Sequence, residues 1–219
     1  MQRPQRILLI NPNTSQATTE AMHALALPCL PDGVSLHSVT AAQGVPMITT
    51  PQELKTAIVQ VATLAEQWIG QADAIVIGAF GNPGLQELQQ LLTVPVLGIG
   101  QAAMQEAAAN GRKFGVATTT PALRSSIDKA VQKLGLQSMY TGCQVPEGEP
   151  LLLAQNPSLQ DAALAQAVHA CIHSDGAQAV VIGGGPLAEC VPRLAPRFDV
   201  PIISPVEAAI RMAVQALKR

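Results

Sequence analysis

The chain has 219 residues, of which 48% are hydrophobic and 13% charged, and its formal net charge at pH 7 is −2. This length and composition are typical of a globular chain with a substantial core and exclude a disordered one. The charge and the 2% of aromatic residues exclude a nucleic-acid-binding surface, and no apolar run is long enough for a signal peptide or a membrane span.

Short apolar runs alternate with longer helical patterns along the whole chain. Strands are predicted at 6–10, 34–39, 74–78, 95–99, 113–118, 136–141, 179–183 and 200–204. Helices are predicted at 14–19, 51–71, 84–92, 101–110, 121–134, 157–174, 187–196 and 205–218. Capping side chains before a proline mark five of their starts, at Thr50, Asn82, Thr120, Asn156 and Ser204. Continuously apolar strands separated by helices predict an α/β fold with parallel sheets covered on both faces.

Two stretches of the sequence resemble each other. Residues 73–109 align with 178–214 through "IG" after a strand, "VP" at the start of the next strand and an alanine-rich helix. This duplication predicts two similar halves, each a four-stranded parallel sheet flanked by helices, related by a pseudo-twofold axis. We expect the first lobe at 1–99 plus the C-terminal helix 205–219, and the second at 100–204. Because ligands bind outside the carboxyl ends of parallel strands, the two lobes would share one cleft.

Glycine-rich turns follow the third strand of each half, at 81–84 and 183–185. Each leads into a helix N-terminus, whose free N–H groups can hold a carboxylate or an enolate oxygen, although a tight turn needs the same residues. Other strand ends carry neutral side chains that suit a ligand with amide or carboxylate groups, while caps and Asx turns explain some of them. Phe80 is either a core aromatic or a wall for the substrate. The candidate substrate-binding residues are Asn11, Asn13, Thr14, Ser15, Phe80, Gly81, Asn82, Thr118, Thr119, Gly184 and Gly185.

Four motifs carry a resemblance to a known family. They are "ILLINPNTS" (7–15), "FGNPGL" (80–85), "VPVLGIGQAA" (94–103) and "VIGGGPLAE" (181–189). Together they resemble the hydantoin (allantoin) racemase branch of the aspartate/glutamate racemase superfamily, over nearly the whole chain. The resemblance implies a protein without cofactors, usually multimeric, that binds a small carboxylate or ureido compound between two lobes.

The resemblance also implies a mechanism with two cysteines, one removing the proton beside a carbonyl and the other returning one. Those cysteines would follow the third strand of each half, where this chain has Ala79 and Gly184. Asn82 replaces the acid of the usual "FGDPG". The superfamily's substrate carboxylate would lie near Thr118 and Thr119. The customary acid/base pair is therefore expected to be absent.

Other reactive side chains offer weak replacements. Glu207 is the reserve general base, although its spacing from Ser204 is that of a capping box. The cysteines Cys29, Cys143, Cys171 and Cys190 form no CxxC pair, and we expect them to be reduced and structural, with Cys190 the least improbable substitute. His169 and His173 are four residues apart but lack a third ligand, so no metal site is expected.

Three functions fit these observations. The first is a cofactor-independent racemase or isomerase. The second is a decarboxylase of the arylmalonate type, since loss of carbon dioxide needs no base. The third is a non-catalytic small-molecule binding protein. We expect a homo-oligomer in the cytoplasm, with no nucleic-acid, membrane or cofactor partner.

Overall fold

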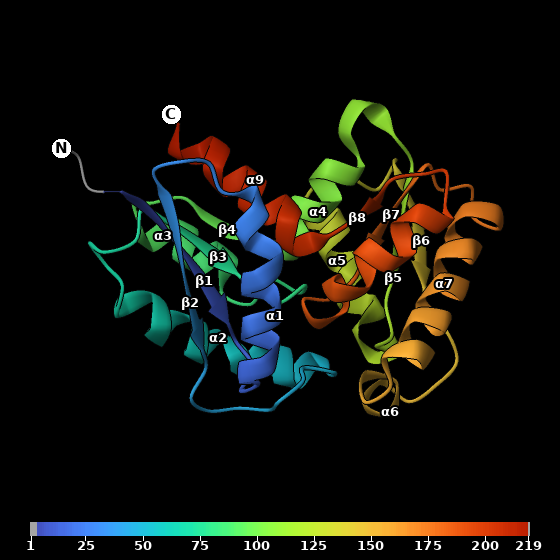
Figure 1. The fold of residues 1–219 in the computed structure, drawn as a ribbon, viewed down its shortest axis with the longest axis horizontal. Helices are drawn as coiled ribbons and strands as arrows, with labels where there is room; N and C mark the ends of the chain where they lie inside the picture. Colours follow the sequence, from blue (N-terminus) through green and yellow to red (C-terminus); the bar gives the residue numbers. More distant parts are fainter. Residues whose placement is uncertain (1–3, 219) are drawn as a thin grey trace.

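Two parallel sheets lie in two adjoining lobes (Figure 1), in a computed structural model that describes residues 4–218. The first sheet contains β1 (Gln5–Asn11), β2 (Val34–Thr40), β3 (Ala74–Ile77) and β4 (Val96–Gly98), and the second β5 (Phe114–Ala117), β6 (Tyr140–Gln144), β7 (Ala179–Ile182) and β8 (Ile202–Ile203). All neighbouring strands are parallel, in the orders β2-β1-β3-β4 and β6-β5-β7-β8. The identical orders confirm the predicted fold class of two similar four-stranded sheets flanked by helices.

The helices are α1 (Gln16–Ala26), α2 (Pro51–Glu66), α3 (Leu85–Leu91), α4 (Ile99–Ala107), α5 (Arg124–Lys133), α6 (Pro150–Ala154), α7 (Pro157–His173), α8 (Val191–Leu194) and α9 (Pro205–Leu217). Helix α6 was not predicted. The helix predicted at 14–19 continues to Ala26 because Met22 and Ala26 bury a second turn against the sheet. The strand predicted at 136–141 is wrong in register: β6 starts at Tyr140, after a turn in which the Tyr140 N–H donates to the Leu136 carbonyl. The helix predicted at 187–196 is split between 3₁₀ turns and α8.

Burial on both faces explains the continuous apolar strands. In β1, Leu8 and Ile10 pack beneath α2, whereas Ile7 and Leu9 face a core that runs on into the second lobe. That core continues because α9 packs on β3 and β4, and α4 packs against α9, β7 and β8. The two lobes therefore share apolar packing around these helices. No helix within residues 4–218 is long and apolar enough to cross a bilayer.

Three of the five predicted caps are confirmed. Thr50 forms a full capping box with Glu53, and the side chains of Asn156 and Ser204 accept the backbone N–H three residues further on. Thr120 does not cap its helix, because its hydroxyl bonds to Thr118.

Asn82 caps a different helix from the one predicted. Helix α3 starts after Gly84, and Asn82 Oδ1 instead accepts the N–H groups of Gly100 and Gln101 at 3.0 and 3.3 Å, at the start of α4. The N-cap residue of α4 is Gly98, and a Cβ atom there would overlap Asn82 Oδ1. The second lobe uses Ser204 at the matching position, with its own hydroxyl as the cap. The two halves thus cap corresponding helices by different side chains.

We expect Asn82→Ala to lower the free energy of unfolding by about 2 kcal/mol, since it removes a cap and places alanine at a φ of 51°. Asn82→Gly keeps the positive φ and isolates the loss of the cap. Asn82→Asp puts a carboxylate at a helix N-terminus, which lowers its folded pKa below the unfolded value of about 3.9. Its extra stability should therefore be present above pH 4 and be lost as the pH falls through the folded pKa. Urea unfolding across pH 3–7 measures the free energy of unfolding of the three variants. A pH-independent difference between Asn82→Asp and the parent would contradict the capping role of this position.

Candidate active site

The two duplicated turns meet at one hollow. They follow β3 and β7, and a Cβ atom on Gly185 would lie 2.7 Å from the Gly78 carbonyl oxygen, so the two turns touch. A cavity of about 60 Å³, here called the cradle cavity, lies beside this contact. Residues from both lobes line it: Asn13, Met47, Ile48, Leu54, 78–81, Thr118, Thr120, Leu123 and 183–187.

The cradle cavity has no ionisable side chain. Among the residues that the structure describes, its lining contains no Asp, Glu, His, Lys, Arg or Cys. Ala79 and Gly184 both line it, one from each turn. A Cβ atom on Gly184 would lie 3.0 Å from Leu187 Cγ, so Leu187 fills the space beside that position. Polar groups can therefore come only from neutral side chains and the backbone.

Backbone N–H groups supply most of those donors. Within residues 4–218, no acceptor pairs with the N–H groups of Ala79, Phe80, Gly81 or Gly185. Buried backbone donors without partners are rare in proteins, so each of these amides calls for water or a ligand. Their residues line one hollow from both lobes, an arrangement that can stabilise an anion or a carbonyl oxygen.

Of the polar side chains after β1, Asn13 lines the cavity and Asn11 holds it in place. Asn11 is fully buried, and its Nδ2 donates to Asn13 Oδ1 at 2.9 Å. Asn13 Oδ1 also accepts the Ser15 N–H at 2.9 Å, which fixes the orientation of the amide. Asn13 Nδ2 is consequently left without a protein partner among the described residues. Ser15 caps α1 and the Thr14 N–H donates to the Val45 carbonyl, and neither residue is part of the cavity lining.

The threonines after β5 have equally distinct positions. Thr118 Oγ1 donates to the Gly183 carbonyl at 2.9 Å, which ties the two turns of the second lobe together. Since that uses its one proton, Thr120 must donate in the 3.1 Å contact between the two hydroxyls. Thr120 therefore offers a lone pair to the cavity. The Thr119 hydroxyl is buried and has no partner among the described residues, and Thr119 is outside the lining.

The predicted site lacks seven side chains of the lining: Thr120, Met47, Ile48, Leu54, Leu123, Pro186 and Leu187. Thr120 looked like a cap, and Met47, Ile48 and Leu54 lie in or after the loop before α2 rather than at a strand end. The run of three threonines was the only sequence signal for Thr120, and nothing in the sequence marked Met47, Ile48 or Leu54.

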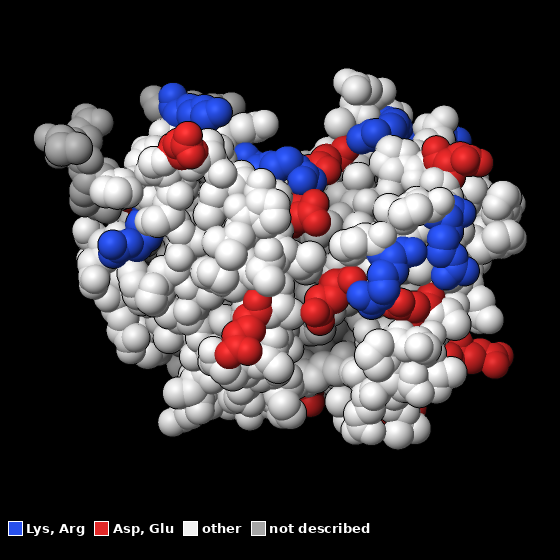
Figure 2. Space-filling view, viewed as in Figure 1, with Lys and Arg blue, Asp and Glu red and all other residues white. Residues whose placement is uncertain are grey.

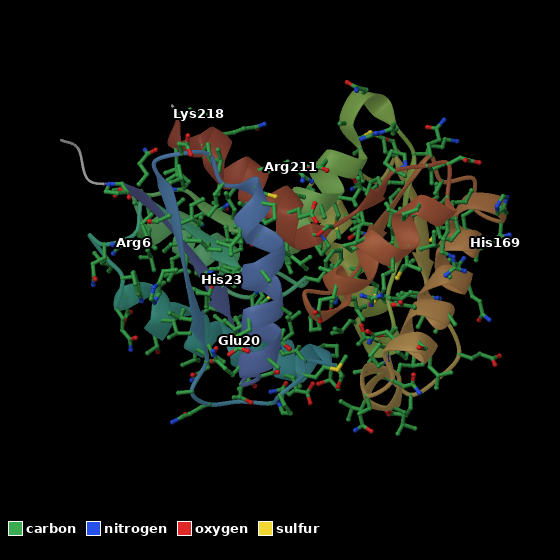
Figure 3. All side chains as sticks on the ribbon, in the orientation of Figure 1. Arg6, Glu20, His23, His169, Arg211 and Lys218 are labelled. Carbon is green, nitrogen blue, oxygen red and sulfur yellow. The ribbon has the colours of Figure 1, made fainter. Side chains whose placement is uncertain are left out.

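Glu207 lies outside the cradle cavity. It is on α9, where its carboxylate pairs with Arg211 at 3.4 Å. Arg211 also forms a two-pronged ion pair with Glu106 of α4 and lies between the lobes in Figure 3. The Glu207 carboxylate is thus engaged by Arg211 within α9, and Glu106 is the carboxylate that joins α4 to α9.

The four cysteines are absent from the lining as well. Burial raises the pKa of Cys143, Cys171 and Cys190 to about 12, and Cys190 Sγ contacts Gln160 Oε1 at 3.6 Å. Cys29 is only half-buried, and burial followed by the nearby Glu207 charge raises its pKa too. Because the thiolate is the reactive form, all four are poor nucleophiles and bases.

We expect iodoacetamide at pH 8 to leave ligand binding and turnover unchanged, because a thiol of pKa about 12 is ionised in only about one molecule in 10⁴. Ellman's reagent should titrate at most one thiol in the native protein, Cys29, and four after unfolding in guanidinium. Loss of binding on alkylation would instead place a thiol in the cavity.

The remaining titratable groups lie elsewhere. His169 and His173 are exposed on α7 with ring centroids 4.1 Å apart, and the described residues include no cluster of three potential metal ligands. The face drawn in Figure 2 is largely uncharged, with most of its charged side chains on the second lobe and near the notch between the lobes.

Comparison with known proteins agrees with this architecture. The family model described as Asp/Glu/Hydantoin racemase matches residues 7–213. The chain is 31% identical to a hydantoin racemase of Rhizobium meliloti, covering 94% of this chain and 86% of that protein, and 28% identical to one of Paenarthrobacter aurescens, covering 95% and 89%. Allantoin racemase from Klebsiella pneumoniae superposes with a TM-score of 0.92 at 29% identity, covering 98% of this chain and 88% of that one. A mutant of arylmalonate decarboxylase shares the fold alone, with a TM-score of 0.65 at 16% identity.

Proposed function

The chain belongs to the Asp/Glu/hydantoin racemase family, and from that premise we propose that the cradle cavity binds a small cyclic ureido compound of the hydantoin type and isomerises it beside a carbonyl. The hydrogen-bonding polarity of the cavity carries this proposal. Asn13 Nδ2 is held as a donor, and Thr120 Oγ1 is held as an acceptor. A ureido ring has both N–H and C=O groups, whereas a carboxylate only accepts. The ring is therefore the better match of the two predicted ligand classes.

The free backbone amides support the chemistry. Loss of the ring proton beside a carbonyl leaves an enolate, and N–H groups aimed at its oxygen stabilise the developing charge. With Ala79 and Gly184 in place of thiols, water must take the proton and return one to either face. General acid–base groups each contribute about 10²–10⁴-fold, so we propose a slow isomerase.

Binding and proton exchange test the proposal together. Calorimetry should detect unsubstituted hydantoin on the parent protein, and NMR in D₂O should show faster exchange at its C5 carbon than in buffer. Thr120→Val removes the acceptor and should weaken binding about tenfold, because a ligand N–H is left unsatisfied. The matched Thr120→Ser keeps the hydroxyl and should bind normally. Equal affinities for these two variants would refute the assigned polarity, and no binding by the parent would refute the function.

A decarboxylase is the second candidate, favoured by one observation. Met47, Leu54, Leu123 and Leu187 make part of the cavity wall apolar, which suits the loss of carbon dioxide from a malonate-like acid. Carbon dioxide release from an arylmalonate would support it. Ligand binding with neither exchange nor carbon dioxide release would support the non-catalytic alternative.

A further inference from the structure

One leucine separates the cradle cavity from a larger hollow. The cavity, at about 60 Å³, is far smaller than the 300–1,000 Å³ of ordinary ligand pockets. Beside it lies a groove of about 430 Å³, and Leu54 and Gly81 line both. A Cβ atom on Gly81 would overlap Leu54 Cδ2, so this side chain rests directly on the cradle turn. A substituent on a ring in the cavity therefore reaches this groove past Leu54, which is the wall on that side.

The groove concentrates positive charge. Of the five lysines in the sequence, three line it: Lys55, Lys129 and Lys133. Glu87 is the only acidic side chain among its described lining residues. The chain as a whole has a net charge of −2, so this cluster does not follow from the overall composition. A cluster of positive charges attracts an anion, and added salt weakens this attraction.

Both lobes contribute to the groove. Lys133 of α5 donates from Nζ to Gln86 Oε1 of α3 at 3.3 Å, across the boundary between the lobes. Gln101 of α4 also lines it, and its Oε1 is one of two buried polar side-chain atoms in the described chain without a partner. Within residues 4–218 its side-chain amide makes no hydrogen bond to protein, so it is available to a polar group in the groove.

A second neighbouring hollow is less suited to an anion. It measures about 410 Å³ and shares only Ile48 with the cradle cavity. No lysine or arginine occurs among its described lining residues, and its acid, Glu53, is occupied by the capping box of α2.

We propose that the lysine-lined groove is the subsite for an acidic substituent on the bound ring, so that the preferred ligand is a 5-substituted hydantoin whose side chain ends in a carboxylate. This rests on the proposed function. Leu54 sets how far the substituent can reach, and Lys129 and Lys133 pair with its carboxylate.

Isosteric ligand pairs test the subsite. The dissociation constants of 5-carboxymethyl- and 5-(2-carboxyethyl)hydantoin are measured against those of their carboxamides, which have the same shape without the charge. At low ionic strength we expect at least one acid to bind about 3- to 10-fold more tightly than its amide, as expected for a few exposed ion pairs. The preference should disappear in K129Q/K133Q and persist in K113Q, which removes an exposed lysine outside the groove. In L54A, affinity for the substituted acid should rise relative to unsubstituted hydantoin.

The outcomes separate the two proposals. If unsubstituted hydantoin binds but neither acid is preferred, or if K129Q/K133Q keeps the preference, the subsite is refuted and the proposed function stands. If no hydantoin binds, the proposed function falls and the subsite with it. Saturable binding of succinate alone, lost in K129Q/K133Q, would assign the groove to a separate dicarboxylate and overturn the substituent role.

Discussion

The double substitution A79C/G184C is expected to raise the rate of hydantoin racemisation at least about 100-fold over the parent. The two positions line one cavity from opposite turns, which is the arrangement a proton donor and a proton acceptor need. Each general acid or base contributes about 10²–10⁴-fold, and the backbone amides that would stabilise the enolate are already in place. Chiral chromatography of a single hydantoin enantiomer measures the gain.

Packing makes the two thiols unequal. Ala79 already has a Cβ atom, whereas a Cβ atom on Gly184 would lie 3.0 and 3.1 Å from Leu187 Cγ and Cδ1. Leu187 must therefore shift, and A79C/G184C/L187A should exceed the double variant. The control A79S/G184S has nearly the same shape but no group that ionises near neutral pH, so it should show no comparable gain. A folded double-cysteine variant that binds hydantoin without faster racemisation would contradict the assigned geometry.

Gly100→Ala should lower the free energy of unfolding by about 3 kcal/mol, against the usual trend for a helix. Alanine normally stabilises a helix by about 1 kcal/mol relative to glycine. Here the added Cβ atom would overlap the Phe80 carbonyl oxygen, a backbone atom of the cradle turn that cannot move alone. The strain of overpacking exceeds the gain in propensity.

Thermal unfolding of Gly100→Ala should show a decrease in Tm of about 6–12 °C for a chain of this size. Hydantoin affinity should fall as well, because the free Phe80 N–H shifts with the turn. The matched control on the same helix is Gln105→Ala, an exposed position expected to change stability by less than about 0.5 kcal/mol. A Gly100→Ala protein as stable as the parent would show that α4 is not seated against this turn.

The part of the fold that was predicted follows mainly from local patterns in the sequence. Continuous apolar runs such as 6–10 and 179–183 give buried parallel strands, and the repeat of 73–109 at 178–214 gives two sheets of one topology. Prediction failed where contacts distant in sequence decide the outcome. The register of β6 depends on how the chain leaves α5, and Asn82 caps α4 because Gly98 leaves room for its side chain.

The sequence by itself determined the two-sheet architecture and the absence of cysteine at positions 79 and 184, since periodicity, repetition and residue identity are properties of the chain. Only the tertiary structure decided the character of the site: the touching of the two turns, the fixed polarity of Asn13 and Thr120, and the wall that Leu54 forms beside a lysine-lined groove. These features depend on side-chain directions and on distances between segments far apart in sequence. Such quantities are fixed by packing, which a linear pattern does not contain.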